Sequence, residues 1–348
     1  MRFVEPLGHG RALTGLWSAA REQRLAHALC FAGPAGAGKF LAAEWLALGL
    51  LCASGPGTPC GTCGPCKRVR AGSHPDLFVI DPLAEGEEEI KIERITPRAD
   101  SSGENLAEFL ALKPMEGGWR IVLLREAERL NEEAQNALLK MLEEPGAETL
   151  LVLVTARPDL LLPTIHSRCV RVTLAAPGLE TALELLAREG VEPIEAALCA
   201  RWSRGAPGAA LELARRAGPR MRELVRGVLA GELDALAAVE AWDALEGDFE
   251  ARTPSASARL KARAFLDLGV ELLSDLRRAR AGLAAEALAH GDLAAARWAP
   301  PLPVLERQLE EWLRARQDVD LNLAPDAAVE RALLALEPPR SPARGTPR

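Results

Sequence analysis

The chain has 348 residues, enough for two or three domains, and 48% of them are hydrophobic, which is ample for buried cores. Its formal net charge of −7 at pH 7 excludes a protein with an overall basic surface, so any contact with nucleic acid would be local or shared with partners. No apolar stretch approaches the length of a membrane span, and residues 1–10 lack the pattern of a signal peptide. We expect a cytoplasmic protein without membrane contact. Its thiols should be reduced, so that clustered cysteines indicate a metal before a disulfide.

A glycine-rich segment follows the first predicted strand. Helical periodicity covers residues 9–20, an apolar strand is expected at 28–31, the sequence Gly-Pro-Ala-Gly-Ala-Gly-Lys occupies 33–39, and a helical pattern covers 41–51. Strand, glycine loop and helix in this order are typical of a phosphate-binding loop. The backbone N–H groups of such a loop turn inward, and its lysine reaches the β- and γ-phosphates. The candidate nucleotide-binding residues are therefore Gly33, Gly36, Gly38 and Lys39.

Two positions depart from what ATP hydrolysis requires. Phe40 follows the lysine, where a Ser or Thr hydroxyl would ligate magnesium. The predicted strand at 119–124 is followed by Arg125 and Glu126, where an Asp-Glu pair would hold the metal and polarise water. An arginine cannot ligate a cation, and it brings positive charge to that position. The sequence therefore predicts that the magnesium site is lost, and it disfavours stable ATP binding.

A second strong pattern, C-x7-C-x2-C-x2-C, is formed by Cys52, Cys60, Cys63 and Cys66. Gly61 and Gly64 lie within the two short gaps, where tight turns can aim the sulfurs at one point. Four thiolates at this spacing suit a closed, tetrahedral structural zinc site. The alternative is a vestigial loop with free thiols. A redox Cys-x-x-Cys site fits less well, because that motif opens a helix after a strand, whereas this one lies in a Gly/Pro-rich excursion.

The remaining apolar runs predict an α/β architecture for the first half of the chain. Strands are expected at residues 77–80, 150–155 and 170–174, and helices at 104–112 and 131–144. Strands that are apolar throughout are buried on both faces, so their alternation with helices indicates a parallel sheet covered by helices on both sides. From residue 180 to residue 337 we find no convincing strand and expect helices only.

Proline positions and composition suggest how the chain is divided. We predict a nucleotide-binding-like domain at residues 1–176, with the zinc module near 52–66, and a small helical domain at 177–218. A linker near Pro219 would lead to an all-α bundle at 219–337. Residues 338–348 are rich in Pro, Arg, Gly and Ser and predict a disordered tail.

Several motifs occur together in the first 175 residues, besides the glycine loop and the cysteines. They are Arg-Leu-Ala-His-Ala at 24–28, Ser-His-Pro-Asp at 73–76, Asn-Ala-Leu-Leu-Lys-Met-Leu-Glu-Glu-Pro at 136–145 and Leu-Pro-Thr-Ile-His-Ser-Arg-Cys at 162–169. In this order they resemble the delta-prime subunits of bacterial DNA polymerase III clamp loaders, which are AAA+ proteins. The resemblance implies an AAA+ P-loop module, a helical lid at 177–218, and a collar at 219–337 that assembles a pentamer.

The resemblance also implies a role for Arg168. In this family the Ser-Arg-Cys sequence carries an arginine that acts in trans, so Arg168 would project into the ATP site of a neighbouring motor subunit. A guanidinium contacts γ-phosphate oxygens bidentately and stabilises the charge that develops during transfer. An ordinary surface arginine is the alternative. The implied partners are the gamma/tau and delta subunits and, through the complex, the sliding clamp (beta) and primed DNA.

Three hypotheses for function remain open at this point. The first is a non-hydrolytic subunit of the polymerase complex, which supplies Arg168 to a neighbour and helps to load the clamp during replication. The second is an active AAA+ ATPase resembling the gamma/tau motor, which usually has an arginine in the lid where this chain has Gly208. The third is a zinc-dependent nucleic-acid binder. This hypothesis is disfavoured because the segment between the cysteines contains no basic or aromatic residues that could contact nucleic acid. Phe40, Arg125 and Gly208 all depart from the sequence that ATP hydrolysis requires, and together they favour the non-hydrolytic subunit.

Overall fold

The computed structural model describes residues 4–82, 87, 89–97, 104–116, 118–146, 148–251, 253–321 and 323–336. Backbone packing divides the chain into two compact units, Met1–Thr181 and Ala182–Arg348. No helix within these described ranges is long and apolar enough to cross a membrane. The predicted tail at 338–348 lies outside the described residues.

A five-stranded sheet forms the centre of the first unit, with strand order β2-β3-β4-β1-β5. Every neighbouring pair of strands is parallel, as predicted. All residues of β1, β3 and β4 are buried, which explains why these strands are apolar apart from Arg120 and the two threonines at the ends of β4. The strands are β1 (Ala28–Ala32), β2 (Leu77–Ile80), β3 (Arg120–Leu124), β4 (Thr149–Thr155) and β5 (Val170–Thr173).

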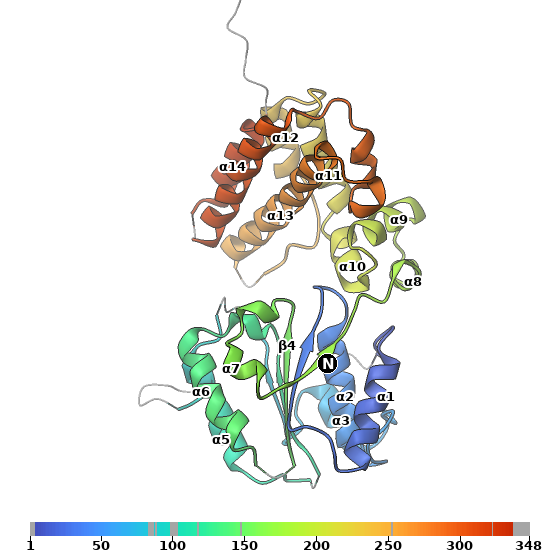
Figure 1. Cartoon of the computed structure of the whole chain (residues 1–348), viewed down its shortest axis with the longest axis vertical. Helices are drawn as coiled ribbons and strands as arrows, with labels where there is room; N and C mark the ends of the chain where they lie inside the picture. The colour runs from blue at the N-terminus through green and yellow to red at the C-terminus, as the bar shows by residue number, and fades with distance from the viewer. Residues whose placement is uncertain are drawn as a thin grey trace, which may run out of the picture. The chain divides into compact units, whose positions relative to one another are not determined.

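Helices cover both faces of this sheet (Figure 1). Along β1, Leu29 and Phe31 belong to the apolar cluster under the first three helices, while Ala28, Cys30 and Ala32 belong to the cluster on the opposite face. This alternation follows from the two-residue period of a strand. The helices on the first face are α1 (Gly10–Arg21), α2 (Lys39–Leu51) and α3 (Gly64–Ala71); those on the other are α5 (Leu106–Ala111), α6 (Glu132–Glu143) and α7 (Pro163–His166).

The short connecting helices of this unit are η1 (Ile92–Arg94), η2 (Ala127–Arg129) and η3 (Pro158–Leu160). Two helices, α3 and α7, were not predicted as such. Both begin with a proline among their first residues, and both are too short to show a helical period in the sequence. The predicted helix at 41–51 begins two residues earlier, at Lys39, directly after the glycine loop.

The second unit is helical throughout its described residues. The helix α8 spans the division between the two units; with the next two helices it encloses a small cluster that includes Leu186 and Cys199. A larger cluster lies around α13, where Gly269 packs so closely that a Cβ there would lie 1.8 Å from the Trp312 ring. The helices are α8 (Leu179–Arg188), α9 (Pro193–Trp202), α10 (Pro207–Arg215), α11 (Gly218–Leu229), α12 (Ala235–Asp243), α13 (Pro254–Arg280), η4 (Ala285–Ala287), η5 (Gly291–Ala295), α14 (Leu302–Asp320) and α15 (Pro325–Leu334). The division into domains at 1–176, 177–218 and 219–337 stays a prediction.

Candidate functional site

The glycine loop lies where the sequence predicts it, between the carboxyl end of β1 and the start of α2. Gly36 and Gly38 adopt positive φ angles of 70° and 87°, which favour glycine. Gly33 is required for another reason, since a Cβ there would lie 2.0 Å from the carbonyl oxygen of Leu174. The predicted loop residues are therefore brought together, and their geometry is that of a strand–loop–helix turn.

Lys39 folds back onto this loop. Its side chain is buried, with 7% of the residue exposed, and Nζ donates to the carbonyl oxygen of Pro34 at 2.7 Å. Burial lowers the pKa of Lys39, although the nearby Glu128 opposes that shift. On the other side of the loop, Nε2 of His9 lies 2.6 Å from the carbonyl oxygen of Ala37. The loop thus supplies one hydrogen-bond acceptor to its own lysine and a second carbonyl oxygen to His9.

The two residues that depart from a magnesium site contact each other. Cζ of Arg125 lies 5.0 Å from the centre of the Phe40 ring, within the range of a cation–π interaction. The same guanidinium forms an ion pair with Asp81, with 2.9 Å between Nη1 and Oδ2. Asp81 directly follows β2, and sequence analysis did not single it out. An internal cation therefore neutralises a carboxylate at this end of the sheet.

The acidic residues after β3 are also engaged. Glu126 has a positive φ of 51°, and its carboxylate pairs with Nε of Arg129. Glu128 accepts a hydrogen bond from the backbone N–H of Ala156 at 3.0 Å. Glu126, the residue expected to polarise water, is thus committed to a structural ion pair.

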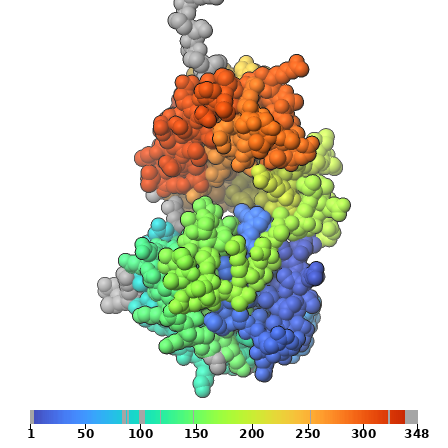
Figure 2. All heavy atoms as spheres, viewed as in Figure 1, coloured from blue at the N-terminus to red at the C-terminus, as the bar shows by residue number. Residues whose placement is uncertain are grey.

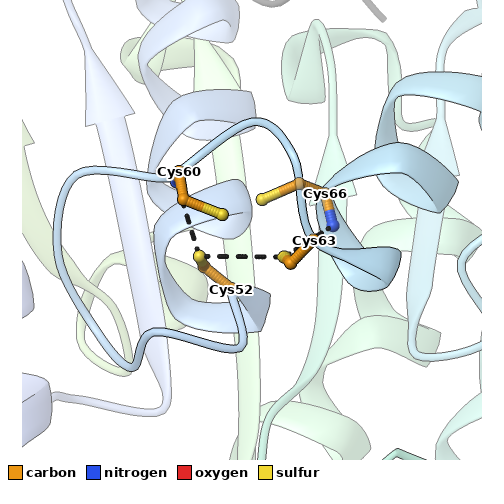
Figure 3. Close-up of side chains that lie close together, drawn as sticks. All are labelled: Cys52, Cys60, Cys63 and Cys66. Carbon is orange, nitrogen blue, oxygen red and sulfur yellow. Dashed lines mark hydrogen bonds between the residues drawn. The ribbon is translucent and has the colours of Figure 1, made fainter.

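The four predicted zinc ligands converge on one point (Figure 3). The sulfur atoms of Cys52, Cys60, Cys63 and Cys66 all lie within 4.8 Å of one another, and those of Cys52 and Cys63 are 4.0 Å apart. A tetrahedral site with Zn–S bonds of about 2.3 Å separates its sulfurs by about 3.8 Å. The cluster therefore fits a zinc ion with little movement.

Local backbone groups prepare some of these thiols for metal binding. Backbone N–H groups of Thr62 and Cys63 lower the pKa of Cys60 to about 5. Cys63 caps α3, and its sulfur accepts the N–H of Cys66 at 3.5 Å. Burial raises the pKa of Cys66 to about 12, so this thiol needs the charge of a metal to ionise near neutral pH.

The segment that carries the four cysteines is attached firmly to the rest of the first unit. Nη1 of Arg21 donates to the carbonyl oxygen of Pro56 at 2.6 Å, and Arg68 of α3 pairs with Glu116. Gly49 of α2 allows a close approach, because a Cβ there would lie 2.2 Å from the carbonyl oxygen of Gly57. The cysteine cluster follows the carboxyl end of α2, whose 13 residues span about 20 Å, so the structure separates it from the glycine loop.

Arg168 lies just after α7, near the amino ends of the parallel strands, whereas the glycine loop follows the carboxyl end of β1. Parallel pairing joins Leu29 to Val170 and Ala32 to Thr173, so the residue before β5 and the residue after β1 are at opposite ends of their strands. Nη1 of Arg168 donates to the carbonyl oxygen of Thr164 at 3.0 Å. The structure does not bring Arg168 together with Lys39.

One buried ion pair explains part of the Ser-His-Pro-Asp motif. Asp76 and Arg120 are 1% and 2% exposed, and Oδ1 of Asp76 lies 3.3 Å from Nη1 of Arg120. Asp76 also accepts the backbone N–H groups of Met115 and Glu116 at 2.8 and 2.9 Å. Arg120 lies over the ring of Phe109 at 4.0 Å. These charged residues have structural roles, and the sequence analysis, which placed Asp76 in a motif and Arg120 in a strand, did not pair them.

Comparison with known proteins gives consistent matches. Residues 8–178 match the family described as "DNA polymerase III, delta subunit". The chain is 38% identical over 244 residues to DNA polymerase III subunit delta' of Pseudomonas aeruginosa, covering 66% of this chain and 70% of that protein. It is 31% identical to the delta' subunit of Bacillus subtilis, covering 59% of each chain. It is also 33% identical over 261 residues to DNA polymerase III subunit tau of Escherichia coli, covering 71% of this chain and 39% of that protein.

Fold and loop together define a parallel α/β protein with a phosphate-loop frame and a helical second half. Within that class, the relatives decide the family. The chain belongs to the DNA polymerase III delta-prime subunits.

Proposed function

We propose that this chain is a non-hydrolytic subunit of the DNA polymerase III clamp loader, which completes the ATP site of a neighbouring tau/gamma subunit with Arg168. The observation that carries the proposal is that Arg168 lies at the amino ends of the strands, while its own glycine loop lies at their carboxyl ends. An arginine at the amino ends cannot reach the loop of its own sheet. It can serve the site of an adjacent subunit, as a trans-acting arginine does.

Three features at and near the chain's own glycine loop support a non-hydrolytic role. Lys39 is hydrogen-bonded to Pro34, Phe40 offers no oxygen to a metal, and Arg125 occupies the expected metal-binding position. An ion pair with Asp81 holds Arg125 there. In this proposal the loop is an architectural element, and the ATP that drives the complex is bound by tau/gamma subunits.

The proposal assigns roles to the remaining parts as well. Zinc at the cysteine cluster is structural, because four thiolates leave no open coordination position. Residues 177–218 form the lid of the AAA+ module, and residues 219–337 form the collar that binds the tau/gamma and delta subunits. The sliding clamp and primed DNA are reached through the assembled complex.

The experiment that tests the arginine role is reconstitution of the complex with Arg168→Ala. We expect a complex of normal composition whose DNA-stimulated ATP hydrolysis falls about tenfold or more at the served site, with poor clamp loading. The measurements are phosphate release in the presence of clamp and primed DNA, and gel filtration for assembly.

Arg171→Ala is the matched control for that experiment. Arg171 is an exposed arginine three residues further along, within β5. Its removal should leave hydrolysis and loading unchanged. Full hydrolysis and loading by the Arg168→Ala complex would refute the trans role.

A further inference from the structure

We propose that Glu143 is a positioning residue for Arg168, holding the guanidinium in the orientation that a neighbour's phosphate requires. The inference rests on the proposed trans role of Arg168 and adds a second residue to it. Oε1 of Glu143 accepts a hydrogen bond from Nη2 of Arg168, and the two form an ion pair. Glu143 is the last residue of α6, and Arg168 follows α7, so the contact joins two separate motifs.

The contacts of Arg168 leave part of its guanidinium free. Nη1 donates to the carbonyl oxygen of Thr164 at 3.0 Å and to Oγ of Ser167 at 3.3 Å. Glu143 takes one N–H of Nη2. A guanidinium has five N–H donors, so within the described part of the chain Nε–H and one further N–H of Nη2 have no partner and can meet an incoming phosphate. Thr164 and Ser167 hold one side of the group, and Glu143 fixes its rotation from the other.

The helix α6 holds the whole segment that carries Arg168, and not the side chain alone. At its amino-terminal end, Oε1 of Gln135 accepts the backbone N–H of Leu162 at 2.8 Å. Nε2 of Gln135 donates to the carbonyl oxygen of Leu130 at 3.1 Å, which fixes the amide. Ile165 of α7 is fully buried against this face. Contacts at both ends of α6 therefore define where the arginine stands.

The pair is also accessible to a partner. The Arg168 side chain is 33% exposed and that of Glu143 is 50% exposed. Figure 2 shows the green segment that includes α7 at the surface of the first unit. An exposed pair of this kind is weak enough for a phosphate to share or displace the carboxylate, yet it restricts the rotamers of a long side chain before the phosphate arrives.

Reconstituted complexes carrying Glu143→Ala and Glu143→Gln test this inference. We expect Glu143→Ala to lower the kcat of DNA-stimulated ATP hydrolysis about three- to tenfold, with KM for ATP unchanged, because the arginine acts in the transition state. Glu143→Gln keeps an oxygen acceptor and should recover most of that loss. Glu144→Ala is the control, since this exposed carboxylate is the next residue and has no described contact with Arg168.

A double variant separates positioning from a general effect on the fold. In an Arg168→Ala background, Glu143→Ala should cause no further loss of hydrolysis. A rise in kcat with either Glu143 variant, or an equal loss in both backgrounds, would overturn the positioning role while leaving the trans role of Arg168 intact. If Arg168→Ala alone changes nothing, the proposed function itself fails, and the role of Glu143 fails with it.

Discussion

Arg125 makes structural contacts at the position where a metal-binding aspartate would be expected in a hydrolytic sequence. Its guanidinium lies over the Phe40 ring and pairs with Asp81, so each of the two departures from a hydrolytic sequence stabilises the other. A single substitution would leave either an uncompensated carboxylate or an isolated ring. These contacts are compatible with the proposed non-hydrolytic role.

Glu44 is affected by the charges of Arg125 and Asp81, and its titration predicts how the stability of the fold depends on pH. It lies on α2 four residues after Phe40, and 9% of the residue is exposed. Burial raises its pKa from 4.5 to about 7, although Arg125 opposes the shift. Because the folded pKa lies above the unfolded value, stability from this group is fully present below about pH 4.5 and is lost as the pH rises through about 7.

Denaturant unfolding of the wild type and Glu44→Gln at pH 5 and pH 8 measures this effect. The glutamine variant has no titration at this position, so the wild type should lose about 2–3 kcal/mol relative to it between the two pH values. Using the difference between the two proteins cancels all other titrating groups. A difference that does not change with pH would show that Glu44 stays ionised in the folded chain.

At the scale of elements, α2 connects the two candidate sites and keeps them apart. Its amino terminus carries the glycine loop, and its carboxyl terminus leads into the cysteine module. Trp17 of α1 packs against Gly49 near that second end, with its Nε1 donating to the carbonyl oxygen of Leu46 at 3.3 Å. The carbonyl oxygen of Gly57, in the cysteine module, also lies close to Gly49, so α1 and the module both pack against this end of α2.

Metal analysis of the purified protein tests the module. We expect about one zinc per chain, and less in Cys63→Ser, because three thiolates bind zinc more weakly than four. Removal of the metal with a chelator should lower the melting temperature of the wild type more than that of this variant. Thr58→Ala, in the same loop and exposed, should retain the metal. Folded wild-type protein that contains no metal would contradict the zinc assignment.

The strands and most helices of the first unit could be predicted from the sequence, because each depends on a local pattern. The all-apolar run of β4 and the cap of α6 at Asn131, whose side chain accepts the N–H of Ala134 at 2.9 Å, are examples. The cysteine cluster and glycine loop were equally accessible, since spacing alone defines them.

Contacts between distant residues could not be predicted in this way. Glu143 and Arg168 are 25 residues apart in the sequence, and Asp76 and Arg120 are 44 residues apart. Nothing in their local sequences shows that they approach each other, because the pairing is set by how the helices pack on the sheet. The Ser-Arg-Cys motif therefore pointed to Arg168 as a candidate trans-acting arginine, but no local pattern pointed to Glu143 as its partner.

For the whole molecule, the proposal is that catalysis belongs to the assembly and not to this subunit. The isolated chain, mixed with ATP and magnesium, should release no phosphate above the uncatalysed background. Losing magnesium ligation alone removes several kcal/mol of transition-state stabilisation, roughly a thousandfold in rate. Lys39→Ala is the control, and it should behave like the wild type. Turnover that disappears in Lys39→Ala would instead establish an active ATPase.

The close contact between Gly33 and Leu174 connects the glycine loop to the segment that carries Arg168. Leu174 immediately follows β5, and Arg168 precedes the same strand, whose four residues extend over about 13 Å. The turn after β1 therefore packs against the carboxyl end of β5, while Arg168 lies just before the amino end of the same strand. If Arg168 acts in trans as proposed, Gly33 has a use that does not depend on nucleotide: it lets the strand that begins near Arg168 pack closely against the loop.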